Sequence, residues 1–68
     1  MMITVNGTER EVTPPVRLLE VLDLAPGESA PRGVAVAVDG SVVPRSQHAT
    51  LELSPGCRVE IVTAVQGG

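Results

Sequence analysis

Apolar and polar side chains alternate at the start of the chain, from Met2 to Val5. Asn6-Gly7 follows this run, and Asn-Gly is the strongest short-range signal for a hairpin between two strands. We therefore expect the chain to return as a second strand from Glu9 to Val12. The charged residues of this second run indicate that one of its faces lies in solvent.

The apolar spacing then changes from that of a strand to that of a helix, which predicts a helix over residues 16–24. Thr13-Pro14-Pro15 suits a helix entry, because Thr13 can cap the free amides and proline is tolerated in the first turn. The segment from Leu24 to Gly27 is expected to end the helix. The apolar stripe consists of Leu18, Leu19, Val21 and Leu22.

The pattern of short strands returns in the second half of the chain. Val34 to Val38 is uncharged, with valines on one face and alanines on the other. We expect this strand to be central in its sheet and covered on at least one face. Asp39-Gly40 predicts a turn into a short strand over residues 41–43, which Pro44 stops.

The last strand is expected over residues 58–65. Before it, residues 45–50 are expected to be irregular or to form a single helical turn, and residues 51–53 are a candidate short strand. The two faces of the last strand differ in character. One carries Val59, Ile61 and Thr63, and the other carries Glu60, Val62 and Ala64.

This order of elements predicts an α+β fold of the β-grasp type. In that fold the first and last strands pair in parallel at the centre of one mixed sheet, here of about four to five strands, and a helix crosses one face. Residues 34–38 would then lie beside the last strand. We expect residues 1–66 to form this domain and residues 67–68 to form a flexible C-terminal tail.

Composition narrows the classes of function. The 68-residue chain has a formal net charge of −3, which argues against a nucleic-acid module because phosphate binding needs clustered cations. A single cysteine, Cys57, excludes an internal disulfide framework and a cysteine-rich zinc site, and we expect no metal or other cofactor.

No apolar stretch approaches the roughly 20 residues of a membrane span. The N-terminus lacks the features of a signal peptide, so we expect a cytoplasmic protein with no membrane partner.

The last two residues, Gly67-Gly68, carry the candidate chemistry. Glycines have a large conformational-entropy cost and no side chain to pack, so this pair adds nothing to a core. A tail without Cβ atoms can instead thread a narrow tunnel and place the Gly68 carboxyl against a phosphate or a nucleophile. A fraying terminus without a function is the alternative. All five cations are arginines, and without lysine the protein cannot link copies of itself through lysine amines.

Several motifs occur together in one order along the chain. They are Val34-Ala35-Val36-Ala37-Val38-Asp39-Gly40-Ser41-Val42-Val43-Pro44-Arg45, Leu53-x-x-Gly56, Val59-x-Ile61 and Thr63-Ala64-Val65-Gln66-Gly67-Gly68, with Met2-Ile3-x-Val5-Asn6-Gly7 at the start. Together they resemble the ThiS family, the ubiquitin-like sulfur carrier proteins of thiamin biosynthesis, and the resemblance spans the chain. The chain differs at His48, where family members often carry Trp, and at Cys57, where Asp commonly follows the glycine.

The resemblance implies a carrier and not an enzyme. An adenylating enzyme (ThiF-like) that uses ATP would join the Gly68 carboxyl to AMP, and sulfur from a persulfide would displace AMP to leave a thiocarboxylate. The other implied partners are a sulfur donor such as a cysteine desulfurase and a thiazole synthase (ThiG-like), which would use the sulfur for the thiazole of thiamin. Gly67 would give the tail its steric clearance and its freedom.

A carrier must be recognised through a surface apart from its tail. A sheet covered by one helix has a second face, and Val62, Ala64 and Val65 are expected to form a docking patch there, with ordinary strand propensity as the alternative. Arg45 would either contact a partner's carboxylate or steady the adjacent loop. The carboxylates expected on solvated strand faces are Glu9, Glu11, Glu52 and Glu60.

Two further side chains invite a catalytic interpretation. Cys57 precedes Arg58, which could lower the thiol pKa slightly, but we interpret it as an incidental small residue at a turn. It would lie about 30 Å from Gly68 at the usual rise of a strand. His48 lacks a serine or cysteine partner for a triad and is interpreted as a surface or packing substitute for an aromatic.

Other functions stay open on the sequence alone. A carrier for molybdopterin or cysteine synthesis would use the same fold and the same terminus. A protein modifier would be joined through Gly68 to amines on other proteins, and a plain β-grasp interaction domain would not use the glycines. No nucleophile–base pair, metal-ligand cluster or phosphate-cradling loop favours an enzyme.

Overall fold

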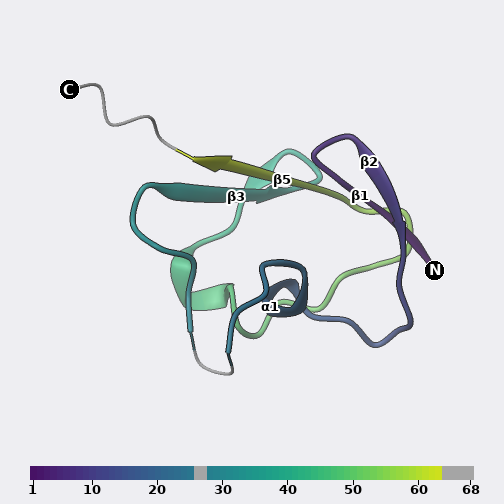
Figure 1. Ribbon diagram of the computed structural model, residues 1–68, viewed down its shortest axis with the longest axis horizontal. Helices are drawn as coiled ribbons and strands as arrows, with labels where there is room; N and C mark the ends of the chain where they lie inside the picture. Colours follow the sequence, from purple (N-terminus) through teal and green to yellow (C-terminus); the bar gives the residue numbers. More distant parts are fainter. Residues whose placement is uncertain (26–27, 64–68) are drawn as a thin grey trace.

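The computed structural model describes residues 1–25 and 28–63, and in them five strands form one mixed sheet (Figure 1). The elements in chain order are β1 (Met2–Val5), β2 (Thr8–Glu11), α1 (Leu18–Val21), β3 (Val34–Val38), β4 (Ser41–Val42), the 3₁₀ helix η1 (Arg45–Gln47) and β5 (Arg58–Thr63). The strand order across the sheet is β2-β1-β5-β3-β4. The last strand is thus confirmed over residues 58–63, and residues 64 and 65 lie outside the described residues.

The first and last strands pair in parallel at the centre of the sheet, as predicted. Thr4 is in register with Arg58 and Val5 with Val59. The pairing extends beyond β1, because the N–H of Asn6 donates to the Val59 carbonyl (2.9 Å) and the N–H of Ile61 donates to Oδ1 of Asn6 (2.7 Å). β3 lies antiparallel on the other side of β5, which confirms its predicted place beside the last strand.

Both predicted hairpin turns are present. Asn6 and Gly7 have positive φ angles of 49° and 82°, and Asp39 and Gly40 have φ angles of 51° and 85°. Two successive residues with positive φ are typical of the turn whose twist matches that of the two strands it joins. The turns therefore set the registers of β1 with β2 and of β3 with β4.

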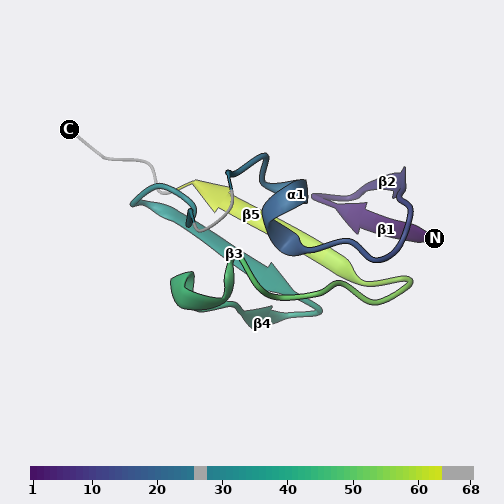
Figure 2. The ribbon, with the colours of Figure 1, turned by 90° about the horizontal axis from the view of Figure 1, so that it is seen from below.

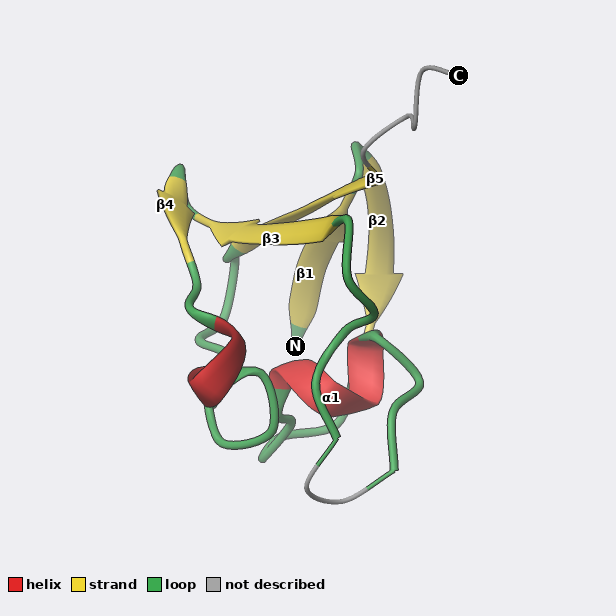
Figure 3. Ribbon diagram, turned by 90° about the vertical axis from the view of Figure 1, so that its left-hand side faces the viewer, coloured by secondary structure: helices red, strands yellow, loops and turns green. Residues whose placement is uncertain are grey.

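The core lies between the sheet and the two short helices. Figures 1 and 3 show α1 and η1 on the same side of the sheet, and Figure 2 shows α1 crossing over its strands. Side chains that alternate along the strands point to this side, which is why valines and isoleucines of β1, β3 and β5 are buried. The most buried apolar residues are Ile3, Val16, Leu18, Ala30, Val36, Val43, Leu53, Cys57 and Val59.

The helix is shorter than predicted, and Thr13 does not cap it. Arg17 is the N-cap, with an extended backbone (φ −104°, ψ 156°), and its N–H donates to the carboxylate of Glu20. The pairing of extended backbone before the helix explains why α1 begins only at Leu18. The N–H of Leu18 donates to the Leu51 carbonyl and the N–H of Leu53 donates to the Val16 carbonyl, so the Val16 carbonyl is engaged outside the helix.

The candidate strand over residues 51–53 is reduced to one isolated bridge, in which Glu52 pairs with Arg17. The predicted single helical turn after Pro44 is confirmed as η1. None of the helices in residues 1–25 and 28–63 is long and apolar enough to cross a lipid bilayer.

His48 is a fully buried member of the core, so the packing interpretation is confirmed and the surface interpretation is wrong. The N–H of Ala30 donates to Nδ1 of the imidazole (3.1 Å). With Nδ1 as acceptor, the neutral ring carries its hydrogen on Nε2, which lies 3.2 Å from the Val43 carbonyl and donates to it. The ring thereby joins the segment before β3 to the end of the β3–β4 hairpin.

We expect the substitution His48→Leu to lower the free energy of unfolding by about 2–4 kcal/mol, because the Ala30 N–H and the Val43 carbonyl lose their partners in the core. Urea unfolding followed by circular dichroism measures the change. Gln47→Leu, at an exposed neighbour on the same 3₁₀ helix, is the control and should change the free energy by no more than about 0.5 kcal/mol. Equal stability of His48→Leu and the wild type would contradict the bonding role of the ring.

Candidate functional site

The predicted reactive residues, Gly67 and Gly68, lie outside the described residues, as do Ala64 and Val65 of the predicted docking patch. The candidate site is therefore described through the surface around the end of β5. Thr63 is the last described residue and pairs with Val34 at the start of β3.

The sheet face opposite the two helices carries an apolar patch. Val62 points to this face and is 60% exposed, and Ala35 of β3 lies directly across from it. The patch continues through Ala37 to Val42 of β4, which is 74% exposed and paired with Ala37. We call these four residues the open-face patch. The predicted exposure of Val62 on the second face is confirmed, whereas its docking role stays a prediction.

Acidic side chains occupy the other half of the same face. Glu60 follows the alternation of β5 and is exposed beside the patch, and Glu9 and Glu11 are exposed on the edge strand β2. Glu11 forms an ion pair with the N-terminal ammonium group (2.9 Å). Glu52 is also exposed, although it lies at the isolated bridge and not in a strand of the sheet. These carboxylates are solvated, as predicted.

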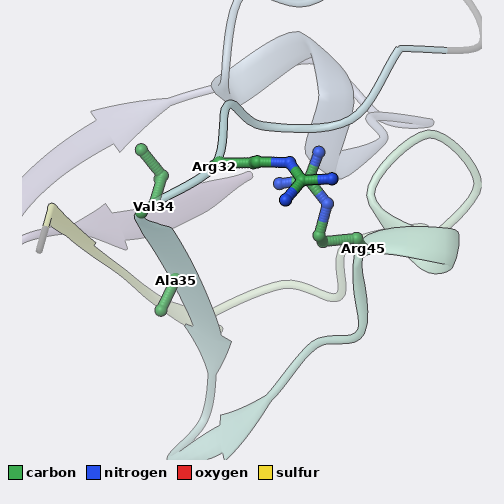
Figure 4. A pocket seen from close by; sticks show the side chains of 5 residues that line it. Arg32, Val34, Ala35 and Arg45 are labelled. Carbon is green, nitrogen blue, oxygen red and sulfur yellow. The ribbon is translucent and has the colours of Figure 1, made fainter.

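Arg45 lies on η1 at the opposite end of β3 from the β3–β4 turn. Its carbonyl oxygen accepts a hydrogen bond from Oγ of Ser29 (2.9 Å), so the backbone of Arg45 steadies the neighbouring loop. Its side chain is exposed and lines an open pocket with Arg32 and the first residues of β3. Figure 4 shows the guanidinium groups of Arg32 and Arg45 pointing toward one another.

Sequence reasoning did not single out Arg32. The residue lies 13 positions before Arg45, and no local pattern links the two. Their proximity depends on the path of the chain through β3, β4 and η1, which returns η1 to the loop that precedes β3.

Cys57 is a core residue and not an incidental side chain at a turn. It is 3% exposed and lies just before β5, where its carbonyl accepts a hydrogen bond from the Thr4 N–H. Burial raises the pKa of the thiol, and the nearby Asp39 carboxylate raises it further. The expectation that Arg58 lowers this pKa is therefore wrong, and the thiol is protonated and shielded at neutral pH.

The two side chains with catalytic potential are separate and already engaged. His48 uses both ring nitrogens in hydrogen bonds to backbone groups, and Cys57 is a protonated thiol in the core. In the part of the chain that the structure describes, no group of three or more His, Cys, Asp or Glu side chains could hold a metal ion.

The element order, the parallel central strands and the helices on one face define a β-grasp protein with an open, partly apolar sheet face. The chain belongs to the ThiS family, whose model matches residues 3–68. The crystal structure of the thiamine biosynthesis protein ThiS from Geobacter metallireducens has a similar fold, with a TM-score of 0.72 and 26% sequence identity over 100% of both chains. None of the curated proteins compared with the chain matches it.

The raised pKa of Cys57 predicts a loss of stability at alkaline pH. The folded state holds the thiol proton more tightly than the unfolded state does. The contribution of the buried thiol to the free energy of unfolding is therefore fully present below about pH 8.5, the usual pKa of a thiol. The contribution is lost as the pH rises through the folded pKa. Cys57 is the one side chain expected to lose a proton at moderately alkaline pH, because the chain has no lysine and no tyrosine.

Urea unfolding at pH 7 and pH 10 measures this effect. The free energy of unfolding should fall more between the two values for the wild type than for Cys57→Ala, in which the α-amino group is unchanged and serves as the internal control. The same fall in both proteins would contradict the burial of a protonated thiol.

Proposed function

We propose that this protein is a sulfur carrier in thiamin biosynthesis and that Gly68 carries the sulfur. The observation that carries the proposal is the match to the ThiS family, which runs to Gly68 and so includes both terminal glycines. The fold that the chain has in common with the Geobacter metallireducens thiamine biosynthesis protein supports it. The engagement of Cys57 and His48 in the core also supports it, since it leaves neither side chain available as a nucleophile.

A carboxylate is a poor acyl donor, because attack on it must expel an oxide. In the proposed sequence, the Gly68 carboxylate attacks the α-phosphate of ATP in an adenylating enzyme, and pyrophosphate leaves. A persulfide sulfur then attacks the acyl carbon, and AMP leaves with the electron pair of the broken C–O bond. A thiol finally cleaves the sulfur–sulfur bond, and Gly68 remains as a thiocarboxylate.

The protein acts in these steps as a macromolecular co-substrate. The adenylating enzyme supplies the activation, a cysteine desulfurase or similar donor supplies the persulfide, and a thiazole synthase receives the sulfur. Residues 1–66 serve as the domain that partners recognise, and Gly67 and Gly68 serve as a flexible tail. A tail without Cβ atoms fits a narrow active site that any larger side chain would block.

We propose the open-face patch as the docking surface, together with Arg45 and with Ala64 and Val65 of the segment that follows β5. Val62 is the central residue of this surface, because it is 60% exposed and lies next to the last residue of β5. The patch includes Val62 near the end of β5 and Ala35 directly across from it, so a partner that covers the patch also contacts the end of β5. Burial of Val62 on docking favours the complex through the hydrophobic effect.

Deletion of Gly68, or Gly67→Val, should abolish sulfur transfer and leave the fold intact, because neither residue contributes to the core. Transfer is measured as thiazole formed in a mixture of ATP, the adenylating enzyme, the sulfur donor, the thiazole synthase and the synthase's other substrates. Circular dichroism melting serves as the control for folding. Normal transfer by either variant would contradict the proposal.

Val62→Arg should weaken binding to the adenylating enzyme by about tenfold or more, because it places a charge at the centre of an apolar contact. Isothermal titration calorimetry measures the dissociation constant. Met2→Arg is the matched control, since Met2 is a partly exposed apolar residue of the same sheet face on the acidic half. Equal effects of the two substitutions would show that the patch is not the docking surface.

A further inference from the structure

Two like charges are held together at the edge of the sheet. The guanidinium groups of Arg32 and Arg45 point toward one another across an open pocket of about 570 Å³ (Figure 4). The remaining lining of the pocket comes from Gly33, Val34 and Ala35. Two of the five cations of an acidic chain thus gather in one place.

The buried residue His48 is hydrogen-bonded to the backbone near both arginines. The imidazole accepts from the N–H of Ala30, two residues before Arg32, and the N–H of His48 itself donates to the Arg45 carbonyl (3.1 Å). The hydrogen bond from Oγ of Ser29 to the same carbonyl adds a second link between the two segments. The two side chains therefore start from backbone positions that are fixed relative to one another.

Neither guanidinium group forms an ion pair with another of the described residues. In residues 1–25 and 28–63, the single ion pair joins the N-terminal ammonium group to Glu11, at the other side of the sheet. Two cations side by side repel each other. An anion between them is attracted by both, and these two attractions outweigh the repulsion that remains. The planar fork of N–H donors on each arginine matches the two oxygens of a carboxylate.

We propose that Arg32 and Arg45 together receive the carboxylate of an acidic side chain on the adenylating enzyme, an inference that rests on the proposed function. The pocket suits such a side chain better than a free anion. Val34 and Ala35 also line the pocket and add apolar surface to it, which the methylene groups of a glutamate can cover. Ala35 also belongs to the open-face patch, so the pocket is continuous with the proposed docking surface.

The charge distribution gives this contact a role in orientation. Glu9 and Glu11 lie on the edge strand β2, away from the arginine pair, and Glu60 lies on the central strand β5, two residues from the exposed Arg58. A partner that presents a carboxylate is attracted to the arginine pair more strongly than to the part of the surface that carries Glu9 and Glu11. The correct orientation directs the end of β5, beside Val34, toward the partner. Complementary charges of this kind set the register of an interface and its rate of association.

The test compares Arg32→Gln/Arg45→Gln with the control Arg10→Gln/Arg17→Gln, which makes the same change of charge at two exposed arginines elsewhere. Calorimetry with the adenylating enzyme measures the dissociation constant at low and at high salt. We expect the first variant to bind about tenfold more weakly at low salt and to lose most of the salt dependence. The control should stay within about twofold of the wild type.

Folding and the proposed function are checked separately. The melting temperature of Arg32→Gln/Arg45→Gln should equal or exceed that of the wild type, since the substitution removes a repulsion.

Wild-type affinity in this variant would overturn the inference, and so would an equal loss in the control. Millimolar binding of inorganic phosphate to the free wild type, with loss of that binding in the variant and unchanged affinity for the enzyme, would instead assign the pair to a free anion. If the wild type forms no thiocarboxylate with the enzyme, ATP and sulfur donor, the proposed function itself fails.

Discussion

The parallel pairing of β1 with β5 is the contact on which the rest of the structure depends. It joins residues more than 50 positions apart, and such non-local contacts require the whole intervening chain to be in place. Ile3 and Val59, which these two strands contribute to the core, are both fully buried. Because β5 runs parallel to β1 and antiparallel to β3, its end lies beside Val34. The same pairing therefore sets both the core and the direction in which the chain leaves the sheet.

A chain without aromatic side chains has few large groups for its core, and His48 fills part of this need. Its ring provides volume, and its two nitrogens satisfy backbone groups from two segments that the sheet does not join. A leucine could provide volume but would leave those groups without partners. The ring bonds Ala30, and the backbone N–H of the same residue bonds the Arg45 carbonyl, so one buried polar residue connects core packing to the charged part of the surface.

The features predicted from the sequence are those with local causes. The turns at Asn6-Gly7 and Asp39-Gly40 depend on two residues each, and the alternation along β3 and β5 depends on neighbours in sequence. The start of α1 could not be predicted in this way, because the pairing of Arg17 with Glu52 decides it.

Long-range packing also explains what sequence reasoning missed at the candidate site. The burial of Cys57 depends on β1, whose Thr4 binds the Cys57 carbonyl. The approach of Arg32 to Arg45 depends on the return of η1 to the loop before β3. The exposure of Val62, by contrast, follows from alternation alone and was predicted.

In the proposed function, the folded domain is recognised by partners and the C-terminus carries the sulfur. The domain keeps Cys57 and His48 in the core and exposes an apolar and charged surface. We propose the carboxyl of Gly68 as the reactive group, a proposal that membership of the ThiS family supports. Sulfur would be carried on that carboxyl and not on the thiol of the chain.

The most direct test of this claim locates the sulfur after loading. The protein is incubated with ATP, the adenylating enzyme and a cysteine desulfurase, and is then fragmented in a mass spectrometer. The account predicts that one oxygen of Gly68 is replaced by sulfur and that Cys57 is unmodified. A persulfide on Cys57 with an unchanged Gly68 would contradict it.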